Sequence, residues 1–138
     1  MPIVLFKDKY YFLNPMFPCE IKIDIQGREM TFLSAESAFR ALQYPAQAGQ
    51  IAKLTGYDAR VLALSQPDPA DWYKNQDDAM RLVQTAKFEQ NPGLLAKLRM
   101  IEKEIIFDNF WNDTYWGRSK NKGLNKLGHL LTDLKRCL

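Results

Sequence analysis

Apolar and polar residues alternate in the first part of the chain, whereas apolar residues recur at helical spacing over most of the rest. The isoleucines within residues 21–25 alternate with charged residues, which is the period-two pattern of a half-buried strand. Gln26-Gly27 favours a tight turn, so residues 28–32 are expected to form the second strand of a hairpin. Residues 1–11 are expected to form a strand and a turn, and the prolines within residues 12–19 indicate a loop.

Apolar residues at helical spacing predict helices from residue 34 onward. Ser34 suits a helix N-cap, and Pro45 follows the end of that first helix. Residues 46–64 are expected to form two short helices broken near Gly56, and residues 75–90 are expected to form a longer one.

Further helices are expected toward the C-terminus. Asn91-Pro92 is a typical helix start, and the apolar face that follows extends to Ile105, although residues 105–107 fit a short extended run equally well. The last helix is predicted by the regular spacing of Leu127, Leu131, Leu134 and Leu138. The expected fold is a single compact α+β domain over residues 1–138, mainly α, with a small N-terminal β-hairpin element.

Composition limits the classes of function. A net charge of +3 over 138 residues is compatible with a phosphate-bearing ligand, but it is too small to indicate nucleic-acid binding by itself. Cys19 and Cys137 suggest no disulfide framework, and the single histidine, His129, argues against a histidine-based metal site. No signal peptide or membrane-spanning run is recognisable, so we expect a cytoplasmic protein with no membrane partner, metal or cofactor.

The C-terminal part of the chain is rich in acids, aromatic residues, asparagine and glycine. Asp108 and Asp113 lie near Tyr115 and Trp116, a combination that suits a pocket in which a flat group stacks and a charge is steered. Asn125 stands at the start of the last helix, near several lysines. This position favours either a seat for a phosphate or a simple helix cap, and spacing does not separate the two.

Two charged residues on predicted helices need further evidence before a functional role is assigned. Glu36 lies at the border of its helix's buried face, where the plain interpretation is a surface ion pair with Arg40 worth ~0.3–0.5 kcal/mol. Lys87 lies on the flank of an apolar stripe, where a lysine usually extends its ammonium group into water.

In the absence of a clear nucleophile, carboxylates are the groups best suited to catalysis in this chain. One carboxylate can orient water or stabilise an oxocarbenium-like sugar cation, and another can donate a proton to a leaving group. Aromatic rings can hold a departing heterocycle by stacking. The combination suits cleavage of an N-glycosidic bond, and it also suits a nucleotide-binding module without chemistry.

Several short motifs follow one another along most of the chain. The first is Ser34-Ala35-Glu36-Ser37-Ala38-Phe39-Arg40-Ala41, and Trp72, Met80 and Lys87-Phe88-Glu89-Gln90 follow it. The last two are Asp113-Thr114-Tyr115-Trp116-Gly117 and Gly123-Leu124-Asn125-Lys126-Leu127-Gly128. In this order they resemble the motifs of the NADAR, or YbiA-like, family, which include Asp-x-x-Trp-Gly and Gly-x-Asn-x-Leu-Gly.

The resemblance implies an N-glycosidase. Known activities of the family act on phosphoribosylamino-pyrimidine intermediates of riboflavin synthesis or on ADP-ribose attached to nucleobases. The expected substrate is therefore a phosphorylated ribosyl or ADP-ribosyl adduct, with nucleic acid as one carrier of it. The matching positions imply Glu36 and Asp113 as catalytic residues, and the expected substrate-binding residues are Lys87, Asp108, Tyr115, Trp116, Gly117 and Asn125.

Three positions depart from the family's pattern. Pro15 stands where the family has an asparagine, Ser37 stands where it has a histidine, and Asp108 stands where it usually has a glutamate. The changes indicate either an altered substrate or a member that binds without cleaving. A non-catalytic module for ADP-ribose or a related nucleotide therefore remains the alternative.

Overall fold

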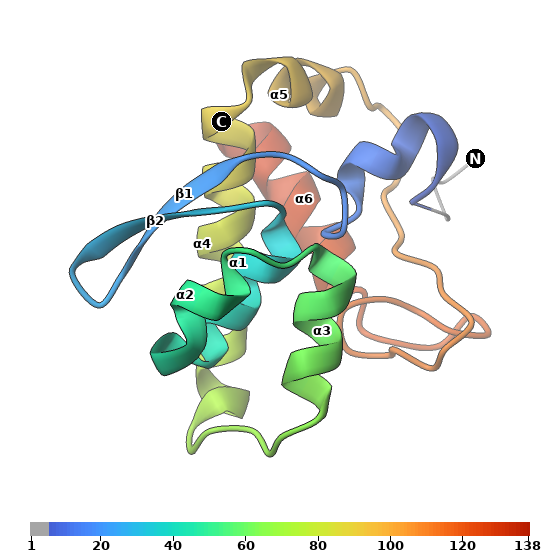
Figure 1. Cartoon of the computed structure of the whole chain (residues 1–138). Coiled ribbons are helices and arrows are strands. Elements are labelled where there is room, and N and C mark those ends of the chain that lie inside the picture. The colour runs from blue at the N-terminus through green and yellow to red at the C-terminus, as the bar shows by residue number, and fades with distance from the viewer. Residues whose placement is uncertain (1–5) are drawn as a thin grey trace. The chain divides into compact units, whose positions relative to one another are not determined.

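The computed structural model describes residues 6–138 of the chain, which divide into two compact units. One unit comprises residues 15–91, and the other comprises residues 6–14 together with 92–138. Helices predominate in both units, and a two-stranded sheet accompanies them, which confirms the mainly α, α+β class (Figure 1). The expectation of one domain over the whole chain stays a prediction.

The β-hairpin lies in the unit of residues 15–91, as predicted. Strands β1 (Ile21–Ile25) and β2 (Arg28–Phe32) pair antiparallel, with Ile21 opposite Phe32. Gln26 and Gly27 both have positive φ angles, 53° and 86°, which is the geometry of a type I′ turn. The isoleucines of β1 are buried, and β1 packs against helices of the same unit.

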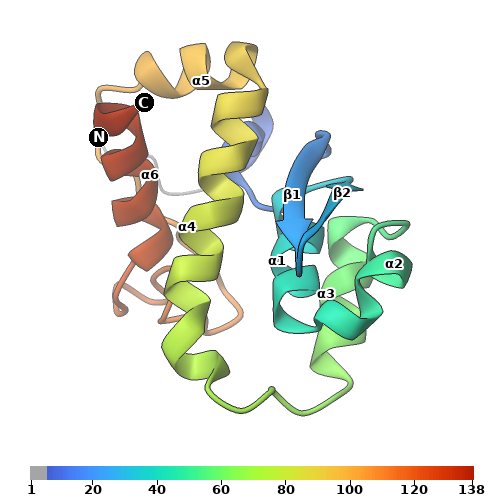
Figure 2. The same ribbon diagram turned by 90° about the vertical axis from the view of Figure 1, so that its left-hand side faces the viewer.

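The helices of this unit are α1 (Ala35–Gln43), α2 (Ala48–Ile51), α3 (Gly56–Leu64) and α4 (Trp72–Gln90), with the 3₁₀ helix η2 (Pro45–Gln47) between α1 and α2. Helix α1 contacts α3 and α4, and Figure 2 shows α4 as the longest helix. Helix α4 begins earlier than predicted, at Trp72, because this indole is buried against the ring of Phe39, with 5.2 Å between ring centroids.

The other unit contains the 3₁₀ helix η1 (Asp8–Leu13) and the helices α5 (Pro92–Arg99) and α6 (Lys126–Cys137). The strand expected near the N-terminus falls mostly outside the described residues, and the turn expected after it is the helix η1 instead. Helix α5 ends at Arg99, so residues 105–107 lie outside it, in agreement with the second interpretation of that segment. The leucines at 127, 131 and 134 form the buried face of α6.

A glycine in α6 allows this helix to approach residues 105–107 closely. A methyl group built on Gly128 would lie 2.2 Å from the carbonyl oxygen of Ile105, far inside van der Waals contact. The backbone on both sides would have to move to admit any side chain. The close approach places the start of α6 directly against residues 105–107, which matters for the candidate site.

The substitution Gly128→Ala is expected to lower the free energy of unfolding by about 1–3 kcal/mol, because the added methyl overpacks this contact. Urea denaturation measures the change. The matched control is Gly93→Ala in α5, where a methyl group meets no atom within 4 Å and is expected to stabilise the protein by about 0.4–1 kcal/mol. Equal effects of the two substitutions would contradict the packing argument.

Candidate functional site

The site residues predicted from the sequence are divided between the two units. Glu36 and Lys87 belong to the unit of residues 15–91. The other unit holds the larger group, Asp108, Asp113, Tyr115, Trp116, Gly117 and Asn125.

Glu36 lies in the first turn of α1, where the backbone holds it firmly. Ser34 caps the helix by accepting a hydrogen bond from the Ser37 amide, at 3.1 Å. The Glu36 amide, one of the free donors of the first turn, donates to the carbonyl of Pro15 at 2.9 Å. The carboxylate is therefore carried by a helix start in which the amides of Ser34, Glu36 and Ser37 all have partners.

The Glu36 carboxylate forms a largely buried ion pair. Arg40 Nε donates to Glu36 Oε2 at 2.7 Å, and the exposed fractions of the two side chains are 15% for Arg40 and 9% for Glu36. Arg40 also donates to Gln43, and Gln43 donates to Asp68 at 2.9 Å, so a polar chain continues from the carboxylate. The pair with Arg40 is confirmed, but the expectation that it lies on the surface is wrong. Withdrawing such a pair from water costs desolvation energy that a surface pair largely avoids.

Lys87 is fully buried, so the expectation that its ammonium group extends into water is wrong. Its Nζ lies 5.8 Å from the ring centroid of Phe17 and 5.3 Å from that of Phe88. Burial lowers the pKa of Lys87 from 10.5 to about 8, and the Cys19 thiol opposes this shift. Burial also raises the pKa of Cys19, an effect that the nearby Lys87 charge reduces.

Two of the positions that depart from the family pattern serve the start of α1. Pro15 supplies the carbonyl that accepts from Glu36, which needs no side-chain amide. Ser37 is fully buried, and its hydroxyl accepts from the Ser34 amide and donates to the Ser34 carbonyl. The Ser37 hydroxyl therefore completes a capping box.

Asn109, which the sequence analysis did not single out, organises the loop that carries the predicted acids. This side chain is 5% exposed, accepts from the Asp113 amide at 2.9 Å and donates to the Asp113 carbonyl at 2.9 Å. Its amide group also donates to the Arg118 carbonyl at 3.0 Å. An asparagine side chain carries both a hydrogen-bond donor and an acceptor. This property was the one indication in the sequence that Asn109 could organise the loop.

Asp113 shapes the backbone of its own motif. Its Oδ1 accepts from the amides of Tyr115, at 3.1 Å, and Trp116, at 2.9 Å, which is the pattern of an Asx turn. The motif's glycine, Gly117, is equally structural, since a methyl group there would lie 2.0 Å from the Phe107 carbonyl oxygen. Asp108, which is half-buried, joins the same loop through a bridge to Arg118.

Tyr115 and Trp116 form an aromatic pair with an associated cation. Their ring centroids are 4.9 Å apart and the rings are nearly perpendicular. Lys126 Nζ lies 4.6 Å from the Tyr115 ring centroid and 3.2 Å from its hydroxyl oxygen. Both rings are half-buried, so each keeps accessible surface for contact with a ligand.

Asn125 fastens α6 to residues 105–107. Its side chain is 1% exposed; Oδ1 accepts from the Phe107 amide at 2.9 Å, and Nδ2 donates to the Ile105 carbonyl at 3.0 Å. The residue occupies the N-cap position with φ at 50°, a conformation that asparagine tolerates well, but its side chain does not cap the helix. Neither of the two roles expected for this side chain describes these contacts, which join two segments of backbone.

These arrangements supply held carboxylates, accessible rings and cations, and they lack an obvious metal centre. Among residues 6–138 there is no group of three or more His, Cys, Asp or Glu side chains that could hold a metal ion. Over the same residues, no helix has the length and apolar character required to cross a bilayer.

The chain is similar to a known protein family and to a solved structure. The family model of the NADAR domain matches residues 5–138. The NMR structure of the E. coli protein YbiA is similar, with a TM-score of 0.81 and 26% sequence identity; the match covers 99% of this chain and 86% of that one. No match was found among the curated proteins.

Asn125→Ala is expected to destabilise the protein by about 2–5 kcal/mol, because it leaves the Phe107 amide and the Ile105 carbonyl buried without partners. Thermal and urea denaturation measure the loss. Asn121→Ala is the matched control, since Asn121 has φ at 64° and is exposed, so both variants share the cost of a left-handed alanine. If the two variants were equally stable, the proposed fastening by Asn125 would be wrong.

Because burial lowers the pKa of Lys87, this residue should make the folded protein more stable as the pH rises. Between pH 8 and 10.5 the unfolded chain binds more protons at this position than the folded chain, so the free energy of unfolding should rise with pH. Relative to Lys87→Met, the wild-type protein should gain up to about 3 kcal/mol across this range. Urea denaturation at several pH values tests the slope, and Lys53→Met, at an exposed position, should show no such difference from wild type.

Proposed function

The chain belongs to the NADAR domain family, and from that premise we propose that it hydrolyses the N-glycosidic bond of a ribosylated base. The substrate class is a phosphorylated ribosyl or ADP-ribosyl adduct, such as ADP-ribose on a nucleobase or a phosphoribosylamino-pyrimidine. Glu36 supplies the carboxylate that acts at the sugar. The reaction breaks the bond between the anomeric carbon and the base nitrogen, and water supplies the new oxygen.

The observation that carries this proposal is the way in which Glu36 is held. A carboxylate within a largely buried ion pair has lost most of its freedom to rotate, and the Pro15 carbonyl and the Ser34 cap fix the backbone beneath it. Such an arrangement costs desolvation energy that a solvated surface glutamate avoids. The matching glutamate of the family's helix motif occupies this position.

An ionised, oriented carboxylate suits the demands of this reaction. The transition state resembles an oxocarbenium ion, whose positive charge a nearby carboxylate stabilises. The same group can orient a water molecule for attack on the anomeric carbon and take up its proton. The departing base requires a proton. Asp113 and Trp116 stay in the proposed catalytic and substrate-binding sets as the family motifs imply, with Trp116 proposed to stack on the base or ribose.

The contacts within the fold modify the roles expected of two binding residues. Asn125 uses both ends of its amide in bonds to backbone, so we assign it to shaping the loop rather than to holding phosphate. Lys87 has no exposed surface, so its proposed contribution is a positive charge felt by a phosphorylated substrate. Tyr115, Gly117 and Asp108 stay in the proposed set of substrate-binding residues.

One observation favours the alternative, a nucleotide-binding module without turnover. Where the family has a histidine able to carry a proton, this chain has Ser37, whose hydroxyl is buried and engaged in the helix cap. A hydroxyl so engaged does not replace an imidazole in proton transfer. If the histidine's proton transfer is essential, the protein binds its ligand and leaves the bond intact.

Glu36→Gln is expected to reduce turnover about 10²–10⁴-fold, because an amide neither stabilises the sugar cation nor accepts a proton. The melting temperature is expected to fall as well, because the largely buried Arg40 guanidinium keeps only a neutral hydrogen-bond partner, so activity is compared at a temperature at which both proteins are folded. Glu29→Gln, at an exposed position of β2, is the control and should retain activity. Released products are measured by liquid chromatography and mass spectrometry.

Two classes of substrate distinguish the two possible activities from binding without turnover. Free ADP-ribose from an ADP-ribosylated nucleoside or oligonucleotide, lost in Glu36→Gln, would identify a hydrolase acting on ADP-ribose adducts. Free ribose phosphate from a phosphoribosylamino-pyrimidine would identify the metabolite branch. Absence of product from either substrate, with ADP-ribose still raising the melting temperature, would replace the hydrolase by the binding module.

A further inference from the structure

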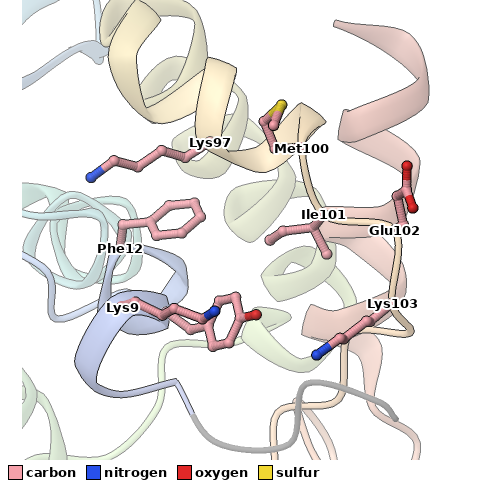
Figure 3. A pocket seen from close by; sticks show the side chains of 8 residues that line it. Lys9, Phe12, Lys97, Met100, Ile101, Glu102 and Lys103 are labelled. Atoms are coloured by element: carbon pink, nitrogen blue, oxygen red, sulfur yellow. The ribbon is translucent and has the colours of Figure 1, made fainter.

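A cavity of about 570 Å³ opens in the unit of residues 6–14 and 92–138. Residues from the 3₁₀ helix η1, from the end of α5 and from the segment that follows α5 line it (Figure 3). The volume is within the range of ordinary small-molecule sites. None of the lining residues belongs to the predicted catalytic or substrate-binding set.

Positive charge dominates the lining of this cavity. Lys9, Lys97 and Lys103 contribute ammonium groups, whereas Glu102 contributes the single carboxylate among the lining residues. In Figure 3 the Glu102 carboxylate and the Lys103 ammonium group point in opposite directions. A ligand that carries a single carboxylate would leave some of these ammonium groups unpaired. A phosphate dianion has more negative charge and more acceptor oxygens, so it matches the three lysines better.

Aromatic rings position two of the ammonium groups. Lys97 Nζ lies 5.7 Å from the ring centroid of Phe12, and Lys9 Nζ lies 5.1 Å from that of Tyr10. These cation–π contacts hold each charge at the cavity wall while leaving its N–H groups free to point toward a ligand. The lysines are thus partly ordered before any anion arrives.

The remaining lining is apolar. Phe12 and Ile101 form a buried floor, 5% and 6% exposed, whereas Met100 is 81% exposed. The exposed Met100 thioether, just after the end of α5 in Figure 3, offers a soft, adaptable surface for a flat ring. Inorganic phosphate would leave this surface unused, and an uncharged ring would leave the lysines unused.

We propose that this cavity binds a nucleoside phosphate. The phosphate lies among Lys9, Lys97 and Lys103, and the base packs against Met100 and Tyr10. Positive groups combined with stacking surfaces are the usual means by which proteins hold single nucleotides of any sequence. The ligand is either a free nucleotide or one nucleotide of a strand, since the two share this chemistry. The proposal stands independently of the glycosidase assignment, because it concerns different residues.

Binding of adenosine monophosphate is the first test, measured by isothermal titration calorimetry at low salt. Adenosine and inorganic phosphate, titrated separately, should each bind at least about tenfold more weakly, since each lacks one half of the contacts. The methionine methyl signals report the location. In protein labelled with ¹³C-methyl methionine, the Met100 signal, identified by its absence in Met100→Leu, should move on addition of the nucleotide.

Substitutions separate the two halves of the site. Lys97→Gln with Lys103→Gln should weaken binding of the nucleotide about tenfold or more, whereas the charge-matched control Lys53→Gln with Lys74→Gln should not. Both lysines of the test pair are exposed, so the fold should tolerate their replacement. Met100→Ala should weaken binding of the nucleotide but leave binding of inorganic phosphate unchanged.

The outcomes decide the proposal and the source of the ligand. Tighter binding of a short single-stranded oligonucleotide than of the mononucleotide, lost in the same lysine variant, would support a strand as the ligand. Mononucleotide binding without that gain would support a free nucleotide. An unmoved Met100 signal, equal binding of inorganic phosphate and nucleotide, or equal effects of the test and control lysine pairs would each overturn the proposal.

Discussion

The Asn125 side chain makes the pair of hydrogen bonds on which the C-terminal unit depends. One amide group satisfies the Phe107 amide and the Ile105 carbonyl, so residues 105–107 need no partner strand at that point. Gly128, one turn along α6, permits the close approach that these bonds require. The loop between Asn109 and Gly117 is therefore attached at a fixed point, and its own asparagine and aspartate side chains complete its shape.

In the other unit, a comparable role falls to the start of α1. The capping box of Ser34 and Ser37 and the bond from Glu36 to Pro15 satisfy donors that would otherwise need water. The carboxylate of Glu36 and the ammonium group of Lys87 are both withdrawn from solvent, at a cost in desolvation. The support for Glu36 as the proposed catalytic group therefore comes from its position in the family motif and from the contacts that hold it.

The departures from the family's motifs acquire a physical interpretation from these contacts. Pro15 and Ser37 contribute to the backbone of the helix start, where a carbonyl and a hydroxyl are sufficient. The substitutions therefore preserve the position of Glu36 while removing groups that carry protons or donate amide bonds. A protein altered in this way still holds the Glu36 carboxylate in place, which is compatible with the proposed glycosidase and with the alternative of a binding module.

The sequence by itself determined the hairpin, the helix that Ser34 caps and the final helix, because each depends on local periodicity, caps and turn residues. It also identified the family motifs and, through them, Glu36 and the Asp113 loop as candidates. Only the tertiary structure decided that Lys87 is buried, that Glu36 pairs with Arg40 away from solvent, and that Asn109 and Asn125 bind backbone. The burial of Lys87 depends on Phe17, and the bonds of Asn125 depend on residues 105–107, segments that no local pattern relates to them.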